Sequence, residues 1–456
     1  MSSVSELWVV GGGLAGSEAA WQAAEAGFTV HLYEMRPEVQ TGAHAGGGLA
    51  ELVCSNSLGS ALPDRASGVL MAELRHMGSL LLGCAEATRL PAGGALAVDR
   101  EAFSAEVTRA LEAHPHIRIE RRRVDRIPVG VGVLASGPLT APALASALRE
   151  FAGEEHLYFY DALSPIAEAG SVDESIAFRA SRYDRGEVEA GDYLNCPMSR
   201  DEYAAFVAAL VGAERIPLRA FEEDIRQGVR AGGDRYFEGC LPVEVMAERG
   251  ELALAYGPLR PVGLTDPRTG KRPFAVVQLR QDDRAGSLYN LVGFQTNLTY
   301  ADQDRVFRMI PGLGQVRFVR HGQMHRNTFV NSPRLLHPWL ETRSRPGLFL
   351  AGQITGVEGY LGNMATGLLA GVNAARVARG ETPIVLPSTT MLGALCDYVT
   401  HADPSHFQPM KAAFGLLPAL PDGPKRGRRD RNRAHAERSA KSMVEAWPEA
   451  MRIATS

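Results

Sequence analysis

The sequence predicts an α/β protein with a parallel sheet, into which an α+β domain is inserted. Three observations predict this fold class. Residues 4–34 follow a strand–turn–helix–strand pattern, residues 151–335 mix strand-like and helical runs, and residues 345–378 return to the opening pattern. Alternating strands and helices are typical of parallel sheets, and a stretch of different character inside such a pattern indicates an inserted unit.

The opening unit has the order of elements that binds a dinucleotide. An apolar run leads into a glycine-rich turn and a helix-forming stretch, and a second strand-like run ends at Glu34. We expect Gly13 to let a pyrophosphate approach the helix N-terminus, and Glu34 to accept hydrogen bonds from a ribose. A purely structural glycine turn is the alternative. The predicted cofactor contacts in this unit are Gly11, Gly13, Leu14, Ala15, Gly16 and Glu34.

A second glycine-rich element predicts that the dinucleotide is FAD. Residues 345–378 again read as strand, glycine-rich turn and helix, and an FAD-binding Rossmann-like domain of the glutathione-reductase type returns such a late segment to the flavin. The alternative is a glycine-rich seam for helix packing. Because the sequence shows no third such element, we expect NAD(P)H to visit an open active site rather than a domain of its own. The contacts predicted here and near the adenine are Gly352, Gln353, Gly367 and Val124.

These patterns divide the chain into four predicted parts. Residues 1–150 form the first part of the FAD-binding domain, and residues 151–335 form the inserted domain. Residues 336–415 return to the FAD-binding domain, and residues 416–456 form a basic C-terminal tail.

Composition and charge indicate a soluble protein of ordinary type. Hydrophobic residues make up 45% of the chain and the net charge is −4, so any nucleic-acid binding must come from local patches. No apolar run reaches the roughly 18 residues of a membrane span. The five cysteines are widely spaced and form neither a CxxC pair nor a zinc pattern. We therefore expect a cytoplasmic protein with reduced thiols and no bound metal.

Blocks along most of residues 4–415 resemble a known enzyme family. The chain is similar to the folate- and FAD-dependent tRNA (uracil-5-)-methyltransferases, which are related to the larger glucose-inhibited-division flavoproteins. Two features depart from these resemblances. Gln353 stands where many flavoproteins have Asp, and the segment beyond about residue 420 shows little similarity to the family. The blocks that carry the resemblance include GGGLAGSEAA, ELVCSNSL (51–58), DYLNCPM (192–198), FEGCLPVE (237–244), LVGFQTNL (291–298) and GVEGYLGNMATGLLAG (356–371).

The resemblance implies a reaction. 5,10-Methylenetetrahydrofolate gives a one-carbon unit to C5 of the T-loop uridine of tRNA (position 54), reduced FAD supplies reducing equivalents, and NAD(P)H reduces FAD. One alternative is a flavoprotein that modifies the wobble uridine of tRNA, like the larger relatives. Another is an FAD-bound RNA-binding protein without activity. The oligomeric state stays open.

That chemistry requires an activated thiol and a base. C5 of uracil is a poor nucleophile until a thiolate adds to C6, and a base must later remove the C5 proton. Cys54 and Cys240 lie in turn-like sequences and are the candidates that the resemblance favours. We favour Cys240 as the nucleophile and Cys54 as the base or its partner, an order that the sequence does not fix. Cys84, Cys196 and Cys396 are expected to be buried structural residues.

Several polar residues are weaker candidates for folate or substrate binding. Asp99 could orient the flavin or substrate, but it could equally cap a helix. Histidines such as His325 are as often structural as functional. This group comprises Asp99, Arg100, Arg280, Gln281, His325, Arg326 and Asn327.

Two basic clusters are candidates for tRNA binding, because RNA binding needs contacts to phosphates. One is Arg121–Arg123, and the other is the C-terminal run over 425–441. The alternative for the second run is a solvated helix face or a disordered tail. Its predicted tRNA contacts are Arg428, Arg429, Arg431 and Arg433.

Overall fold

The first domain is built on a five-stranded parallel sheet. The computed structural model describes residues 6–41, 43–44, 46–153, 157–184, 188, 191–216, 241–420 and 427–447. The strand order is β16-β7-β1-β2-β6, and every neighbouring pair is parallel. The late strand β16 therefore extends the sheet of the N-terminal domain, as predicted for a return segment. The strands are β1 (Glu6–Val10), β2 (Thr29–Glu34), β6 (Ile117–Arg121), β7 (Gly132–Leu134) and β16 (Leu348–Leu350).

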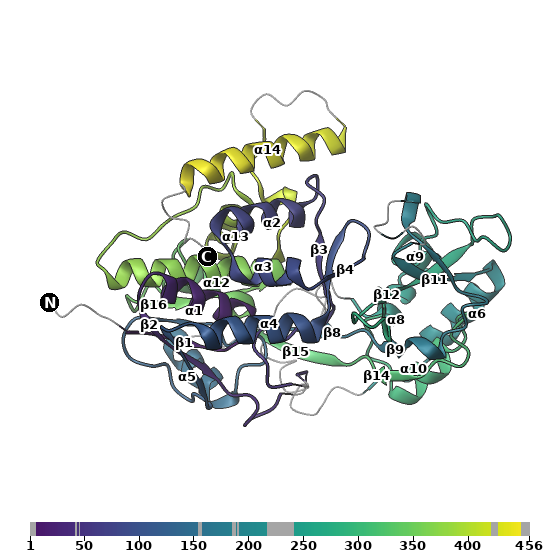
Figure 1. Ribbon diagram of the computed structural model, residues 1–456, viewed down its shortest axis with the longest axis horizontal. Coiled ribbons are helices and arrows are strands. Elements are labelled where there is room, and N and C mark those ends of the chain that lie inside the picture. The colour runs from purple at the N-terminus through teal and green to yellow at the C-terminus, as the bar shows by residue number, and fades with distance from the viewer. Residues whose placement is uncertain are drawn as a thin grey trace.

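Helices cover both faces of this sheet (Figure 1). Alternate residues of β1 point to opposite faces, so Val9 belongs to the core under α1 and α12, whereas Trp8 belongs to the core under α5. This is the doubly covered sheet that an α/β fold requires. The helices are α1 (Leu14–Glu25), α4 (Arg100–Ala113), α5 (Pro142–Ala152) and α12 (Tyr360–Ala378).

Helices α1 and α12 pack in unusually close contact. A Cβ atom on Gly367 would lie 2.2 Å from the carbonyl oxygen of Ala15, and one on Gly371 would lie 2.5 Å from that of Ala19. Only glycine allows such an approach of two helix backbones. Gly367 thus occupies the helix-packing seam that was the alternative to a cofactor contact.

The inserted domain has a six-stranded antiparallel sheet in the order β10-β11-β12-β13-β9-β14. It lies to one side of the first domain in Figure 1 and has its own apolar core. The antiparallel pair β8 (Leu157–Ala162) and β15 (Met324–Phe329) leads into and out of it. The other elements are β9 (Ile166–Glu168), β10 (Phe178–Ala180), β11 (Tyr193–Met198), α6 (Arg200–Val211), α8 (Val243–Glu248), α9 (Ala253–Tyr256), β12 (Ala275–Gln281), β13 (Leu288–Leu291), α10 (Tyr300–Phe307) and β14 (Phe318–Arg320).

A third group of elements joins the two domains and carries the C-terminus. The small sheet β3-β5-β4 projects from the first domain toward the second. The group comprises β3 (Ser57–Ser60), α2 (Ala66–Met77), α3 (Leu80–Ala87), β4 (Arg89–Leu90), β5 (Ala95–Val98), α11 (Ser332–Leu335), η5 (Gly352–Thr355), β17 (Val357–Glu358), α13 (Met391–His401), β18 (Met410–Lys411) and α14 (Arg428–Ala446).

The basic C-terminal segment contains a docked helix, α14, which lies on α2 at the top of Figure 1. Asn432 donates to the carbonyl oxygen of Asp64 at 3.2 Å, the Ser439 hydroxyl binds the Glu73 carboxylate, and Trp447 is fully buried. The buried stripe Asn432, His435, Ser439 and Met443 has helical spacing, a signal that the sequence contained.

None of the helices that the structure describes is long and apolar enough to cross a membrane.

Candidate functional site

The turn between β1 and α1 is closed on two sides and open on the third. Gly11 has φ = +102°, and a Cβ atom there would lie 2.4 Å from the Ala135 carbonyl oxygen. A Cβ on Gly16 would lie 1.7 Å from the Gly11 oxygen, whereas one on Gly13 would meet nothing within 4 Å. Gly13 is also the N-cap of α1, which receives no side-chain cap. The turn thus offers a helix N-terminus beside open space, which fits a pyrophosphate.

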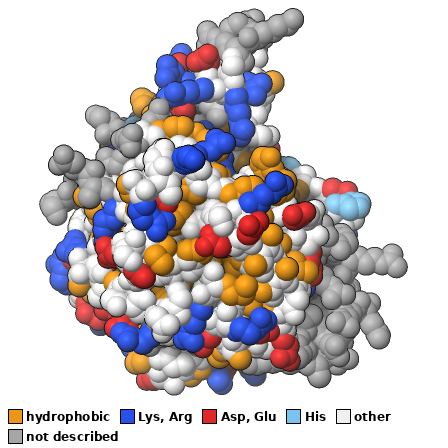
Figure 2. Space-filling view, turned by 90° about the vertical axis from the view of Figure 1, so that its right-hand side faces the viewer, with side chains coloured by type: hydrophobic (Ala, Val, Ile, Leu, Met, Phe, Trp, Pro, Cys, Tyr) orange, Lys and Arg blue, Asp and Glu red, His pale blue; other side chains and the backbone are white. Residues whose placement is uncertain are grey.

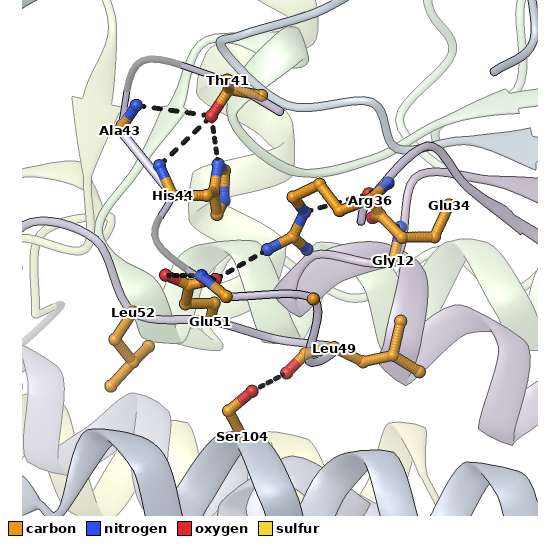
Figure 3. Close-up of polar contacts among 12 residues, drawn as sticks. Gly12, Glu34, Arg36, Thr41, Ala43, His44, Leu49, Glu51, Leu52 and Ser104 are labelled. Carbon is orange, nitrogen blue, oxygen red and sulfur yellow. Dashed lines mark hydrogen bonds and ion pairs between the residues drawn. The ribbon is translucent and has the colours of Figure 1, made fainter. Parts of the chain in front are cut away.

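Glu34 lies at the end of β2, directly beside this turn. Its Oε2 accepts the Gly12 N–H at 2.8 Å, and its Oε1 accepts the Arg36 Nε at 3.0 Å. Arg36 is 2% exposed and also donates to Glu51 at 2.9 Å, so its guanidinium lies between two carboxylates (Figure 3). Burial acts to raise the pKa of Glu34, but hydrogen bonds and charge from Arg36 outweigh it and hold the pKa below its usual value. Glu34 is therefore an ionised acceptor.

The loop after Arg36 is anchored on α4. The Ser104 hydroxyl donates to the Leu49 carbonyl oxygen at 2.7 Å, and the Leu49 N–H donates to the Thr108 hydroxyl at 2.8 Å. Figure 3 shows this anchor below Arg36, and the turn around Thr41 above it. The anchors fix the path of the chain from the nucleotide side to the segment that carries Cys54.

Cys54 lies where this loop meets the N-terminus of α12. The backbone N–H groups of Cys54 and Ser55 both donate to the Tyr360 hydroxyl oxygen, at 2.9 and 3.0 Å. Tyr360 is the first residue of α12, whose N-cap, Gly359, supplies no side chain. Burial raises the pKa of Tyr360 above its usual value, so the phenol stays neutral. The positive end of the α12 dipole therefore faces the Cys54 segment.

Two arginines hold the Cys54 segment from the other side. Arg280, buried on β12, donates to the Asn56 side-chain oxygen and the Ser55 hydroxyl, both at 2.7 Å. Arg100 donates to the Asp282 carboxylate and to the Leu52 carbonyl oxygen, both at 3.1 Å. Both arginines were predicted as folate or substrate contacts. Their hydrogen bonds hold the loop around Cys54, and their predicted contacts to folate or substrate stay predictions.

A third arginine, Arg320 on β14, makes the cluster strongly electropositive. Its Nε and Nη2 are buried and find no hydrogen-bond partner among the described residues, and the same holds for Nη2 of Arg100. Burial, and secondarily the charge of Arg100, lowers the pKa of Arg320 to about 10, so it remains cationic at neutral pH. The charge of Cys54 also acts on Arg320, which places the two groups in one electrostatic environment. The sequence carried no signal for Arg320 or Tyr360.

The return segment lies against the start of α1. A Cβ on Gly352 would lie 2.7 Å from the Ala15 Cβ. Gln353 donates to Glu358 at 2.8 Å. Val124 is partly buried against the sheet. The predicted flavin and adenine contacts of these residues stay predictions.

Two of the weaker candidates have structural partners. Asp99 is the N-cap of α4, accepts the Ala102 N–H at 2.9 Å and also accepts the Arg284 N–H at 2.9 Å, which is the alternative given for it. The Gln281 side chain donates to the Asp283 carbonyl oxygen at 2.7 Å. Asn327 is buried on β15. Cys240 and the side chains of His325 and Arg326 lie outside the described residues, so their predicted roles stay predictions.

The other cysteines are buried, as predicted. Burial raises the pKa of Cys84, Cys196 and Cys396 to about 12 in each case. Such thiols are un-ionised at neutral pH and do not act as nucleophiles.

The two basic clusters differ in how they are used. Arg121 donates to the carbonyl oxygens of Arg36 and Gly47, and Arg123 pairs with Asp125, so this cluster is engaged locally. Four of the five arginines of α14 are exposed, whereas Arg438 is half-buried, and Arg429 pairs with Asp64 at 3.2 Å. The exposed set is Arg428, Arg429, Arg431 and Arg433.

Known proteins match this chain over nearly its whole length. It is 55% identical over 440 residues to the methylenetetrahydrofolate–tRNA-(uracil-5-)-methyltransferase TrmFO of Desulforudis audaxviator, covering 96% of this chain and 97% of that protein. It is 56% identical to the TrmFO of Moorella thermoacetica, again covering 96% and 97%. The chain belongs to the TrmFO family. The family model described as glucose inhibited division protein A also matches residues 6–382.

Solved structures show that the TrmFO chain shares its fold with a larger relative. GidA of Aquifex aeolicus aligns with a TM-score of 0.68 at 17% identity, over 98% of this chain but 77% of GidA. A second crystal form gives a TM-score of 0.67 over 97% of this chain. At this identity the likeness supports the fold.

Proposed function

We propose that this protein transfers the one-carbon unit of 5,10-methylenetetrahydrofolate to C5 of the T-loop uridine of tRNA, using bound FAD. The observation that carries the proposal is the position of Cys54, on a segment clamped between Tyr360 and the arginine cluster. The relatives that match this chain over 96% of its length are named for this donor, for tRNA and for uracil C5. The match to their full length, against about three quarters of GidA, favours this reaction over wobble-uridine modification.

The residues of the first domain fit FAD. The open turn at Gly13 would receive the pyrophosphate, the ionised Glu34 would accept a ribose hydroxyl, and the segment at Gly352 would border the flavin. FAD, when bound and reduced, would supply the hydride that reduces the transferred carbon to a methyl group. We propose NAD(P)H as the reductant of FAD.

The Cys54 cluster fits the role of a base. Guanidinium groups and a helix N-terminus near a thiol favour its ionised form, and a thiolate can accept the C5 proton of the uracil adduct. The same cations would stabilise negative charge on the uracil carbonyl oxygen when a second thiol adds to C6. Cys240 remains our candidate for that nucleophile, and His325, Arg326 and Asn327 for folate binding. The exposed α14 arginines would contact tRNA phosphates.

A covalent trap separates the two thiols. With tRNA that carries 5-fluorouridine in the T-loop, whose C5 has no removable proton after alkylation, the wild-type protein should form an adduct that survives denaturation. Cys240→Ala should abolish the adduct. Cys54→Ala should still form it but methylate ordinary tRNA about 10²- to 10⁴-fold more slowly, the usual range for loss of a general base.

Controls decide what each result means. Cys396→Ala removes a fully buried thiol and should leave both the adduct and the methylation rate nearly unchanged. An adduct that persists in Cys240→Ala contradicts the assignment of the nucleophile. Mass spectrometry of T-loop fragments that shows no methyl gain in the wild type, or a gain at the wobble uridine instead, overturns the proposed function.

A further inference from the structure

A large cleft lies between the two domains and α14. Its volume is about 1550 Å³. Helices α2 and α14 form one wall, the tips of β3 and β5 form another, and the inserted domain contributes Arg182, Tyr183 and Arg260. Lys and Arg side chains gather at the level of α14 in the upper part of Figure 2.

The charge of the cleft is opposite to that of the whole chain. The lining contains three acids: Glu73 is buried and accepts the N–H groups of Met391 and Leu392, Asp64 is paired with Arg429, and Glu437 is exposed, so six arginines outnumber them. The chain as a whole has a net charge of −4. A local excess of cations on such a chain is the electrostatic pattern of a polyanion site. The cations that line the cleft are Arg65, Arg182, Arg260, Arg428, Arg429 and Arg433.

An aromatic ring stands among these cations in a fixed position. Tyr183 is 61% exposed and has φ = +59°, a left-handed conformation that a bulky residue rarely adopts. Its N–H donates to the Gly263 carbonyl oxygen at 2.8 Å, and a Cβ on Gly263 would lie 3.0 Å from the ring. Next to it, Arg182 donates to the carbonyl oxygens of Arg260 and Val262 at 2.7 and 2.8 Å. The wall therefore holds an exposed ring at a strained residue.

The cleft reaches the two strands that border the clamp around Cys54. Tyr193 lines the cleft and pairs across the sheet with Arg280, the residue that holds Ser55 and Asn56. Gln278, also in the lining, is two residues before Arg280 on the same strand, a separation of about 7 Å. The cleft therefore lies next to Arg280, one of the residues that hold the Cys54 segment.

We propose that this cleft binds an unpaired segment of the substrate tRNA, with phosphates on Arg260 and Arg433 and one base stacked on Tyr183. The proposal rests on the proposed function for the identity of the RNA. Arginines interleaved with an exposed aromatic ring are the composition of surfaces that bind single-stranded nucleic acid, in which the ring stacks on a base and the cations follow the backbone.

The test measures tRNA binding without the folate, by fluorescence anisotropy over a range of salt. Tyr183→Ala should weaken binding about 5- to 150-fold with an unchanged salt slope, because stacking involves no counterion release. Tyr183→Phe should bind like the wild type. Arg260→Gln with Arg433→Gln should reduce the slope of log K against log salt by about 1.4 to 1.8, the value for two phosphates.

Matched arginines and cross-linking complete the design. Arg118→Gln with Arg149→Gln removes two exposed arginines outside the cleft and should change neither affinity nor slope. Photo-cross-links from 4-thiouridine tRNA should map to Tyr183 and to α14. FAD absorbance shows whether each variant is folded. If Tyr183→Ala loses FAD, the double arginine variant and the cross-links test whether tRNA binds in the cleft.

The outcomes separate the cleft from the proposed function. A wild-type protein that binds and methylates tRNA, with unchanged affinity in Tyr183→Ala and an unchanged slope in the arginine variant, overturns the cleft proposal alone. Cross-links confined to other surfaces would also overturn the cleft proposal, and a protein partner would then be the occupant to test. A wild-type protein that neither binds nor methylates tRNA overturns the function on which the proposal rests.

Discussion

The turn between β1 and α1 (the nucleotide turn) and the clamp around Cys54 are built in different ways. The turn is made of backbone: Gly11, Gly13 and Gly16 contribute shape and N–H groups within six residues of chain. The clamp is made of side chains, and its main contacts join Cys54 to Tyr360, 306 residues away, and Ser55 to Arg280, 225 residues away. The turn offers a ligand a complementary backbone shape, whereas the clamp surrounds Cys54 with positive charge.

The turn and the clamp also differ in how they affect the stability of the fold. The nucleotide turn pairs its buried arginine: Arg36 lies between two carboxylates. The clamp leaves Nε and Nη2 of Arg320 and Nη2 of Arg100 buried without a hydrogen-bond partner among the described residues. Buried polar groups without partners cost stability and are typical of sites that bind a charged ligand. We therefore expect the turn to stabilise the fold and the clamp to cost stability in exchange for chemistry.

The strongest test of the turn is steric. Gly16→Ala places a Cβ 1.7 Å from the Gly11 carbonyl oxygen, so the turn must deform, and we expect loss of bound FAD and at least about 3 kcal/mol of stability. Gly83→Ala, on an exposed position of α3 with nothing within 4 Å, is the matched control and should stabilise by up to about 1 kcal/mol. FAD absorbance measures the bound cofactor and urea unfolding measures the stability of each variant. A yellow, stable Gly16→Ala protein would show that the turn tolerates a side chain.

The clamp should respond in the opposite way. Arg320→Met removes a cation whose Nε and Nη2 are buried without a hydrogen-bond partner among the described residues, so we expect the melting temperature to rise, by the equivalent of about 1–2 kcal/mol, while the methylation rate falls about 10²-fold. Arg320→Lys keeps the charge and should retain part of the rate. Flavin fluorescence during heating gives the melting temperature, and initial rates at saturating tRNA give the methylation rate. A variant that loses stability as well as rate would assign Arg320 a structural role.

A pH series distinguishes the anion of the turn from an ordinary surface acid. Because Arg36 lowers the pKa of Glu34 below its reference value of 4.5, the ionised carboxylate stabilises the fold above that value and loses its contribution as the pH falls through the lower, folded pKa. Glu34→Gln should cost about 1–3 kcal/mol at pH 7.

The difference in the free energy of unfolding between Glu34→Gln and the wild type should then become smaller below pH 4.5. Urea unfolding at several pH values measures it. Glu112→Gln, on the exposed face of α4, should show no gap at any pH. A gap for Glu34→Gln that stays constant in acid would contradict the ionised state of Glu34.

The sequence predicted the turn well because its determinants lie close together. The glycine spacing and the terminal acid of β2 fall within about 30 residues, and local rules connect them directly to geometry. The return strand was predicted for the same reason, since 345–378 repeats that local pattern and β16 joins the sheet. The role of Gly367 is harder to predict, because glycine serves both close packing and ligand approach; the structure shows the close packing on Ala15, and the cofactor contact stays a prediction.

The clamp could not be predicted in the same way. Arg100 and Arg280 were named from local context, but their partners lie on other elements, so their role as loop clamps depends on the tertiary fold. Tyr360 and Arg320 carried no local signal. By contrast, the docking of α14 was readable in principle, because its buried residues recur at helical spacing.

The bond between the Cys54 segment and Tyr360 also sets an order of events during synthesis. A ribosome adds about 5–20 residues per second, so the 306 residues that separate the two positions take about 15–60 s to make. During that interval the Cys54 segment can already lie outside the exit tunnel, before the phenol that binds its backbone N–H groups has been translated. The thiol would therefore be present on a growing chain whose active-site loop is not yet held in place.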